Sequence, residues 1–153
     1  MKKRTIVLSV LAAVLLLTAT TYSFANAPAK GTMGVWGYVV DAKNASLDVS
    51  DQPGADTLVV SRVTAPQAAW LVVHADDNGM PGMRVGLAHI DKGASTDVSV
   101  KLTGVKTQKV IVAVHADKGT PGKFEFDMDN KEKSADRPFF VNRKELARIV
   151  TVR

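Results

Sequence analysis

Residues 70–82 read WLVVHADDNGMPG, and a second copy of the same pattern, VIVAVHADKGTPG, occupies residues 110–122. In each copy an apolar run ends in His-Ala-Asp and enters a loop that closes on Pro-Gly. The two histidines lie 41 residues apart, and the second loop is one residue shorter than the first. Because side chains alternate along a strand, the His and Asp of each copy share one face. Both faces begin apolar, which predicts two central strands that are covered on both sides.

The Pro-Gly pairs predict a type II turn in both loops. Pro81 and Pro121 would occupy the second turn position, and the following glycine would supply the positive φ that the third position requires. Asp76 and Asp117 would then accept backbone N–H groups of their own loops. Under this interpretation the two motifs are structural, and each aspartate caps a turn.

The same residues support a second interpretation, a metal site. His and Asp at i and i+2 point the same way and could chelate one ion, while two methionines add thioethers suited to Cu(I). Carboxylate oxygens suit calcium, although the EF-hand spacing is absent. The candidate ligands are His74, Asp76, Met80, Met83, His115 and Asp117. No other cofactor is expected, and His89 is interpreted as a strand-end side chain.

The rest of the chain consists of short β-branched or alternating segments separated by turn residues, without helical periodicity after the N-terminal segment. Strands are expected at 35–40, 46–50, 57–63, 83–90, 96–102, 123–127, 138–141 and 146–152. Residues 123–127 should form the hairpin partner of the second motif strand, and the charged run 129–137 should be a solvated loop. The expected core includes Trp36, Val60, Trp70, Val73, Val100, Val112, Val114 and Phe124. The pattern predicts one all-β domain, residues 35–153, with seven to ten strands in a sandwich or barrel.

The N-terminus has the layout of a secretory signal peptide. Basic residues at 2–4 precede an apolar run of 14 residues, Ile6 to Ala19, and small residues at 23 and 25 suit cleavage after Ala25. Residues 1–25 are therefore expected to be a signal-peptide helix, and residues 26–34 a loose leader. The alternative is an uncleaved anchor, but the run is shorter than the roughly 20 residues that span a bilayer. After cleavage no membrane span is expected, and the protein would be periplasmic or extracellular.

Charge and cysteine content narrow the class of protein. The formal net charge is +5, but three of the 20 basic residues lie in the signal, which leaves 17 basic against 15 acidic residues. This small excess gives no support for nucleic-acid binding. The chain has no cysteine, which excludes disulfides and thiol chemistry.

From Asp48 to Val152 the chain resembles an uncharacterised exported β-sandwich family of bacteria and archaea, filed as a domain of unknown function. The resemblance rests on Val49–Gln52, the two His-Ala-Asp motifs with their Gly-x-Pro-Gly loops, Phe124-Glu125-Phe126 and Asp136-Arg137-Pro138. It implies a single Ig-like two-sheet sandwich on a secreted or cell-surface protein, and it implies no activity.

No catalytic signature is found: Gly-x-Ser-x-Gly, Ser-x-x-Lys, His-Glu-x-x-His and Gly-rich phosphate loops are all absent from the sequence. The expectation is therefore an exported, non-enzymatic binding or structural module of unknown ligand, with a protein or the cell surface as partner. The alternative is a periplasmic copper-type or calcium-binding protein that uses the His-Ala-Asp loops.

Overall fold

The computed structural model describes residues 40–54, 56–127, 129–130 and 133–152. The expected signal peptide (1–25), the leader (26–34) and the start of the domain, including Trp36, lie outside the described residues.

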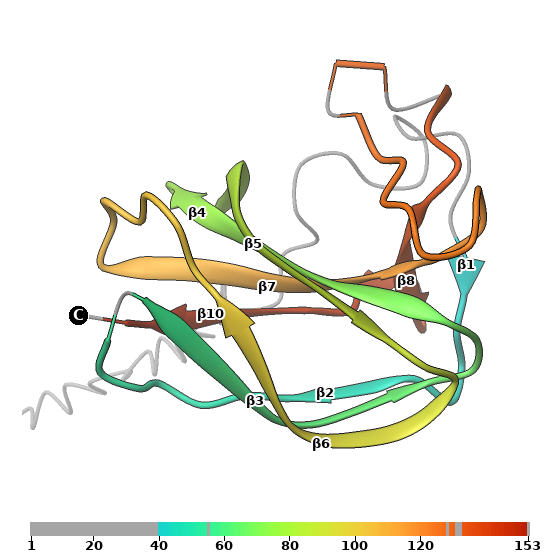
Figure 1. Ribbon diagram of the computed structural model, residues 1–153, viewed down its shortest axis with the longest axis horizontal. Helices are drawn as coiled ribbons and strands as arrows, with labels where there is room; N and C mark the ends of the chain where they lie inside the picture. Colours follow the sequence, from blue (N-terminus) through green and yellow to red (C-terminus); the bar gives the residue numbers. More distant parts are fainter. Residues whose placement is uncertain (1–39, 55, 128, 131–132, 153) are drawn as a thin grey trace, which may run out of the picture.

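The described part of the chain contains ten strands (Figure 1). They are β1 (Val40–Asp41), β2 (Ser46–Asp48), β3 (Thr57–Ala65), β4 (Ala69–Asp77), β5 (Met80–Ile90), β6 (Gly93–Lys101), β7 (Lys109–Ala116), β8 (Arg137–Val141), β9 (Lys144–Glu145) and β10 (Ala147–Thr151). Both motif copies lie at strand ends, as the alternation predicted. No helix among these residues has the length and apolar character that crossing a bilayer would require.

The strands form two sheets packed face to face (Figure 1). The larger sheet has the order β1-β8-β7-β4-β5, with β10 also paired along β7 and β9 along β8. The smaller sheet has the order β2-β3-β6. The pairing of β1 with β8 is parallel, and the other strand pairs are antiparallel. The all-β sandwich is thus confirmed, and β4 and β7 are central strands of the larger sheet.

The apolar core fills the space between the sheets. Leu71 and Val73 of β4 and Val112 and Val114 of β7 are fully buried there, because their strand positions face the smaller sheet. The smaller sheet contributes further fully buried residues, among them Leu58, Val60, Val63 and Val100. The intervening positions of β4 and β7, among them both motif histidines, face the opposite side of the larger sheet.

The turn predicted for the first motif copy is wrong. Asn78 and Gly79 have φ of 54° and 82°, and Asp77 pairs with Met80 across them. Two central residues with positive φ define the type I′ hairpin, which Asn-Gly favours because its twist matches the strands. Pro81 is instead part of β5, where an edge strand tolerates its missing N–H.

In the second copy the predicted turn is confirmed: Gly122 has φ of 73°, and the Lys123 N–H donates to Thr120 O at 3.0 Å. The strand predicted over 123–127 is wrong, because β4 lies along one edge of β7 while β8 and β10 share the other. No free edge of β7 remains for a hairpin partner. The chain after β7 forms a long loop instead, and Phe124 is half-buried rather than fully buried.

The expectation of a solvated loop over 129–137 is also wrong at its C-terminal end. Asp136 is completely buried, and Ser134 and Arg137 are each 6% exposed. This end is buried because the Asp136 carboxylate accepts hydrogen bonds from backbone N–H groups of the long loop, which holds the loop against the start of β8.

Candidate functional site

The outer face of β4 and β7 brings the two motif histidines together. Trp70 pairs with His115 and Val72 with Ala113 across the antiparallel strands. His74 lies further along β4 on the same face, and the small Val72–Ala113 pair separates the two histidine positions. Their side chains lean toward each other over this pair, so the ring centroids lie 6.4 Å apart.

Segment 117–127, the start of the long loop, folds back over this face (Figure 1). Phe126 meets the His115 ring edge to face at 4.7 Å between centroids, and Phe124 lies 5.8 Å from the same ring. Phe124 also contacts Trp70 edge to face at 5.7 Å. We call Trp70, His74, His89, His115, Phe124 and Phe126 the outer aromatic cluster. It forms a second apolar layer outside the sandwich core.

A buried carboxylate anchors segment 117–127 in this position. Asp136 Oδ1 accepts hydrogen bonds from the backbone N–H groups of Lys118, at 2.9 Å, and Gly119, at 3.4 Å. Its Oδ2 accepts one from the Glu125 N–H at 2.7 Å. Since hydrogen bonds to a charged acceptor are stronger than neutral ones, one side chain fixes both ends of the segment that carries Phe124.

The opposite wall comes from β5, which is irregular beside His74. Asp76 pairs with Pro81, His74 with Arg84, and Val73 with Gly86. Between the first and second of these pairs β4 advances two residues and β5 three, and between the second and third β4 advances one residue and β5 two. β5 therefore contains two bulges. Bulges re-aim side chains, and here they set Arg84, rather than Met83, opposite His74.

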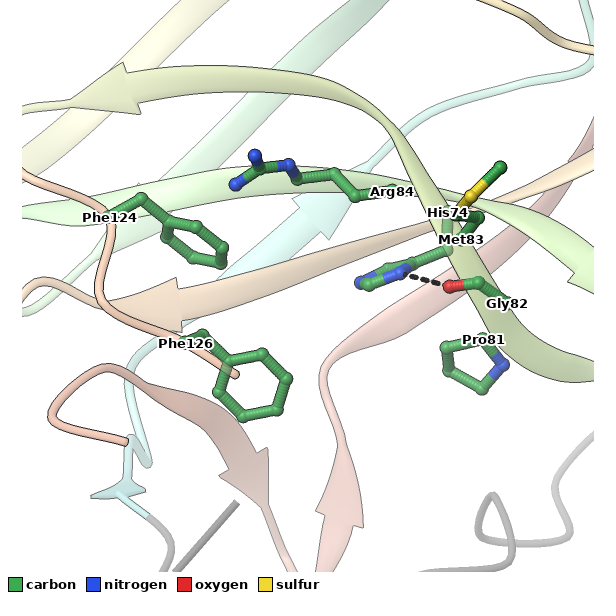
Figure 2. A pocket seen from close by; sticks show the side chains of 7 residues that line it. All are labelled: His74, Pro81, Gly82, Met83, Arg84, Phe124 and Phe126. Atoms are coloured by element: carbon green, nitrogen blue, oxygen red, sulfur yellow. Dashed lines mark hydrogen bonds between the residues drawn. The ribbon is translucent and has the colours of Figure 1, made fainter. Parts of the chain in front are cut away.

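Between these walls lies a pocket of about 450 Å³, which we call the outer-face pocket (Figure 2). Its side-chain lining comes from His74, Met83, Arg84, Phe124 and Phe126, and the Pro81–Gly82 segment completes it. The Arg84 guanidinium carbon lies 5.1 Å from the centroid of the Phe124 ring, a cation–π contact. A positive charge, a histidine and two aromatic rings thus converge on one open space.

The hydrogen bonding of His74 fixes which of its nitrogens is available. Nδ1 lies 2.9 Å from Gly82 O (Figure 2). Because a carbonyl oxygen only accepts, we assign the ring hydrogen to Nδ1, which leaves the lone pair on Nε2. His74 is 3% exposed, and burial, aided by the charge of Arg84, lowers its pKa. The ring therefore stays neutral at pH 7 and offers a hydrogen-bond acceptor.

His115 lies deeper in the cluster and is 1% exposed. Burial, with a smaller contribution from His74, lowers its pKa to about 3. Its Nδ1 is buried without a hydrogen-bond partner among the described residues. His115 is therefore a neutral, aromatic packing group under the two phenylalanines.

The predicted aspartate caps are confirmed. Asp76 Oδ1 accepts the Gly79 N–H at 2.7 Å, and Asp117 Oδ2 accepts the Gly122 N–H at 2.8 Å. Asp117 Oδ2 also lies 3.0 Å from Nε2 of His89, the side chain that the sequence placed at a strand end. Through these backbone hydrogen bonds each aspartate caps its own loop, and Asp117 additionally contacts β5 through His89.

The structure does not bring the six candidate metal ligands to one point. Asp76 lies at the C-terminal end of β4, whereas Asp117 donates its N–H to Ala68 O just before β4 begins. Met83 is 80% exposed and shares the outer-face pocket with His74, while Met80 is 39% exposed and is not part of its lining. In the described ranges no three His, Asp or Glu side chains lie close enough to share an ion.

Two residues that shape the site, Arg84 and Asp136, were missing from the sequence-based candidates. The Asn78-Gly79 hairpin signal would have aligned β5 with β4, but an unbroken register places Met83 opposite His74. Gly82 and Gly86 within β5 could have suggested bulges there, but they do not specify the register that substitutes Arg84. Asp136 looked like part of a solvated charge run, and only the fold reveals its burial.

A family model described as a domain of unknown function matches residues 45–152, more than half of the chain. Its N-terminal limit falls just before β2, and its C-terminal limit just after β10. No curated protein and no solved structure gives a significant match.

Proposed function

Because the chain belongs to the DUF7282 family of domains of unknown function, we propose its role from its own geometry: an exported, non-enzymatic binding module. The observation that carries the proposal is the outer-face pocket, where the Arg84 guanidinium and a neutral histidine face an open space of about 450 Å³ beside two phenylalanine rings. Ligand pockets commonly combine apolar walls with a few convergent polar groups.

Export is the second part of the proposal. Its support is the basic, apolar and small-residue layout of residues 1–25. An exported module would lie in the periplasm or outside the cell. There the pocket could bind a small molecule or a chemical group on a protein or cell-surface partner. The proposal includes no catalytic step, because the sequence carries none of the common catalytic signatures.

An Ig-like sandwich is the third part. The strand order supports it: β2-β3-β6 faces a sheet that contains β10-β7-β4-β5. This matches an A-B-E sheet against a G-F-C-C′ sheet when the strands are taken in chain order. The outer aromatic cluster would then lie on the outer face of the C and F strands.

The test is a screen of a chemically diverse fragment library against ¹⁵N-labelled protein. Amide chemical shifts should change at Gly82, Arg84, Phe124 and Phe126 for some compounds, and remain constant on the smaller sheet. A matched variant, Phe124→Asp, should lose these responses and keep the sandwich spectrum, since Phe124 lies outside the core. A screen in which no compound shifts the pocket amides would overturn the proposal.

Metal binding is the second candidate function, with a smaller ligand set than the motifs suggested. The observation in its favour is the free Nε2 of His74 in the same pocket as the exposed Met83 thioether. The positive charge of Arg84 opposes a bound cation, and in Figure 2 the Met83 thioether points away from the phenylalanine rings. A melting temperature that Cu(I) raises in the protein but not in Met83→Leu would favour this candidate, by mass action on the native state.

A further inference from the structure

The guanidinium of Arg84 is a cation with no carboxylate partner among the residues that the structure describes. Its side chain is exposed and lies over the Phe124 ring. Within the part of the chain that the structure describes, no carboxylate lies within ion-pair distance of it. Glu125, which follows Phe124 in segment 117–127, pairs with Lys123 and accepts the Thr120 N–H. The planar guanidinium therefore has its donors available for a carboxylate from outside the chain.

The imidazole of His74 presents the opposite kind of group. With Nδ1 engaged by Gly82 O, its Nε2 can only accept a hydrogen bond. A ligand with acceptor oxygens alone, such as sulfate, would satisfy the guanidinium but set an oxygen lone pair against Nε2. A complementary ligand carries an anionic group for Arg84 and an O–H or N–H donor for His74.

The two phenylalanines define the shape of the space between these groups. Phe124 and Phe126 are half-buried, lie 6.3 Å apart between centroids and line the pocket with part of their rings. Aromatic ligands gain from offset or edge contacts with such rings. A planar aromatic body between the anionic group and the donor fits this wall.

Building on the proposed function, we infer that the outer-face pocket binds an aromatic hydroxy acid: the carboxylate pairs with Arg84, the hydroxyl donates to His74 Nε2, and the ring packs against Phe124 and Phe126. A metal cation would face the uncompensated charge of Arg84. An uncharged aromatic alcohol would leave the guanidinium without a partner.

The experiment measures binding of four probes by calorimetry and by shift titration on the purified protein at low salt. The probes are 3-hydroxybenzoate, 4-hydroxybenzoate, benzoate and 3-hydroxybenzyl alcohol. One of the hydroxybenzoates should bind about 2–10 times more tightly than benzoate, since a neutral hydrogen bond contributes that much. It should bind at least about 10 times more tightly than the alcohol, since a charge-assisted bond contributes more.

Substitutions at Arg84 and His74, with a control at Arg62, assign the contacts. Arg84→Gln should remove the preference for the carboxylate, while Arg62→Gln, an exposed arginine of β3 on the smaller sheet, should leave all affinities unchanged. His74→Phe should make benzoate and the hydroxybenzoate bind equally. Because His74 is buried, unfolding curves show whether each variant folds. The comparison of benzoate with the hydroxybenzoates on the unmodified protein tests the same contact without a substitution.

The outcomes separate the two proposals. Equal binding of benzoate and hydroxybenzoate to the unmodified protein, or an unchanged carboxylate preference in folded Arg84→Gln, overturns the ligand class. Absence of binding by all four probes, while other library compounds shift the pocket amides, overturns the ligand class and leaves the binding module standing. Absence of any pocket response to the whole library overturns both.

Discussion

Replacing Asp136 tests whether one carboxylate holds the long loop against the sheet. Asp136 is completely buried and accepts two short hydrogen bonds, from Lys118 N at 2.9 Å and Glu125 N at 2.7 Å, and a longer one from Gly119 N at 3.4 Å. A hydrogen bond to a charged group contributes about 1.5–3 kcal/mol. Two such bonds predict that Asp136→Ala lowers the free energy of unfolding by about 3–6 kcal/mol.

The isosteric change Asp136→Asn should cost less, about 2–4 kcal/mol. Its amide oxygen can still face Lys118, but its NH₂ group then meets the Glu125 N–H, donor against donor. Urea unfolding followed by tryptophan fluorescence measures both values. Asp48→Asn, which neutralises an exposed β2 carboxylate that makes no side-chain hydrogen bond or ion pair among the described residues, should change stability by less than about 0.5 kcal/mol.

Hydrogen exchange gives an independent measurement on the same variants. The amides of Lys118 and Glu125 should exchange faster in Asp136→Asn. The exchange rates of the Val112 and Val114 amides in the core should change only as much as the global free energy of unfolding predicts. If Asp136→Ala costs less than about 1 kcal/mol and the Glu125 amide keeps its protection, the anchoring role assigned to Asp136 is wrong.

Three further predictions concern other parts of the molecule. Burial lowers the pKa of His115 to about 3 from its ordinary 6.5. Below pH 6.5 the imidazole therefore binds a proton in the unfolded chain but stays neutral in the folded one. Its contribution to the free energy of unfolding should fall by about 2 kcal/mol from pH 7 to 5. His115→Phe should flatten that loss in urea titrations at the two pH values, and an unchanged slope would contradict the burial argument. A Cβ at Gly86 would lie 2.8 Å from Leu102 Cδ2 and 3.1 Å from Lys101 O, so Gly86→Ala should destabilise by about 1–3 kcal/mol in thermal or urea unfolding, and unchanged stability would mean that the strand yields freely. Exported protein should begin at Asn26 by N-terminal sequencing; recovery of Met1 in the membrane fraction would support an anchor instead.

The alternation of apolar residues was sufficient to predict the sandwich, because strand faces follow from a period of two. Core positions such as Val60, Val73, Val112 and Val114 were predicted correctly for the same reason, and all are fully buried. The aspartate caps could also be predicted, since they depend on groups only a few residues apart in the sequence.

The site itself depends on features that local sequence does not encode. The bulges that set Arg84 beside His74 result from pairing with β4. Whether residues 123–127 form a strand depends on which other strands pair with the edge of β7. Asp136 and Lys118 are 18 residues apart, so their hydrogen bond appears only once the chain has folded back. The Asn78-Gly79 turn is a different case, because its sequence signal was present and the Pro-Gly pair was wrongly preferred.

The two bulges of β5 also bear on how copies of this protein avoid one another. β5 is the outermost strand at one side of the larger sheet, and a straight, hydrogen-bonding edge of this kind can recruit a strand from another molecule. The bulges increase the local twist, and Pro81 at the start of the strand lacks an N–H to donate. An additional strand would therefore find few regular hydrogen-bonding partners along β5, so the irregularity that shapes the pocket also protects the protein against edge-to-edge aggregation.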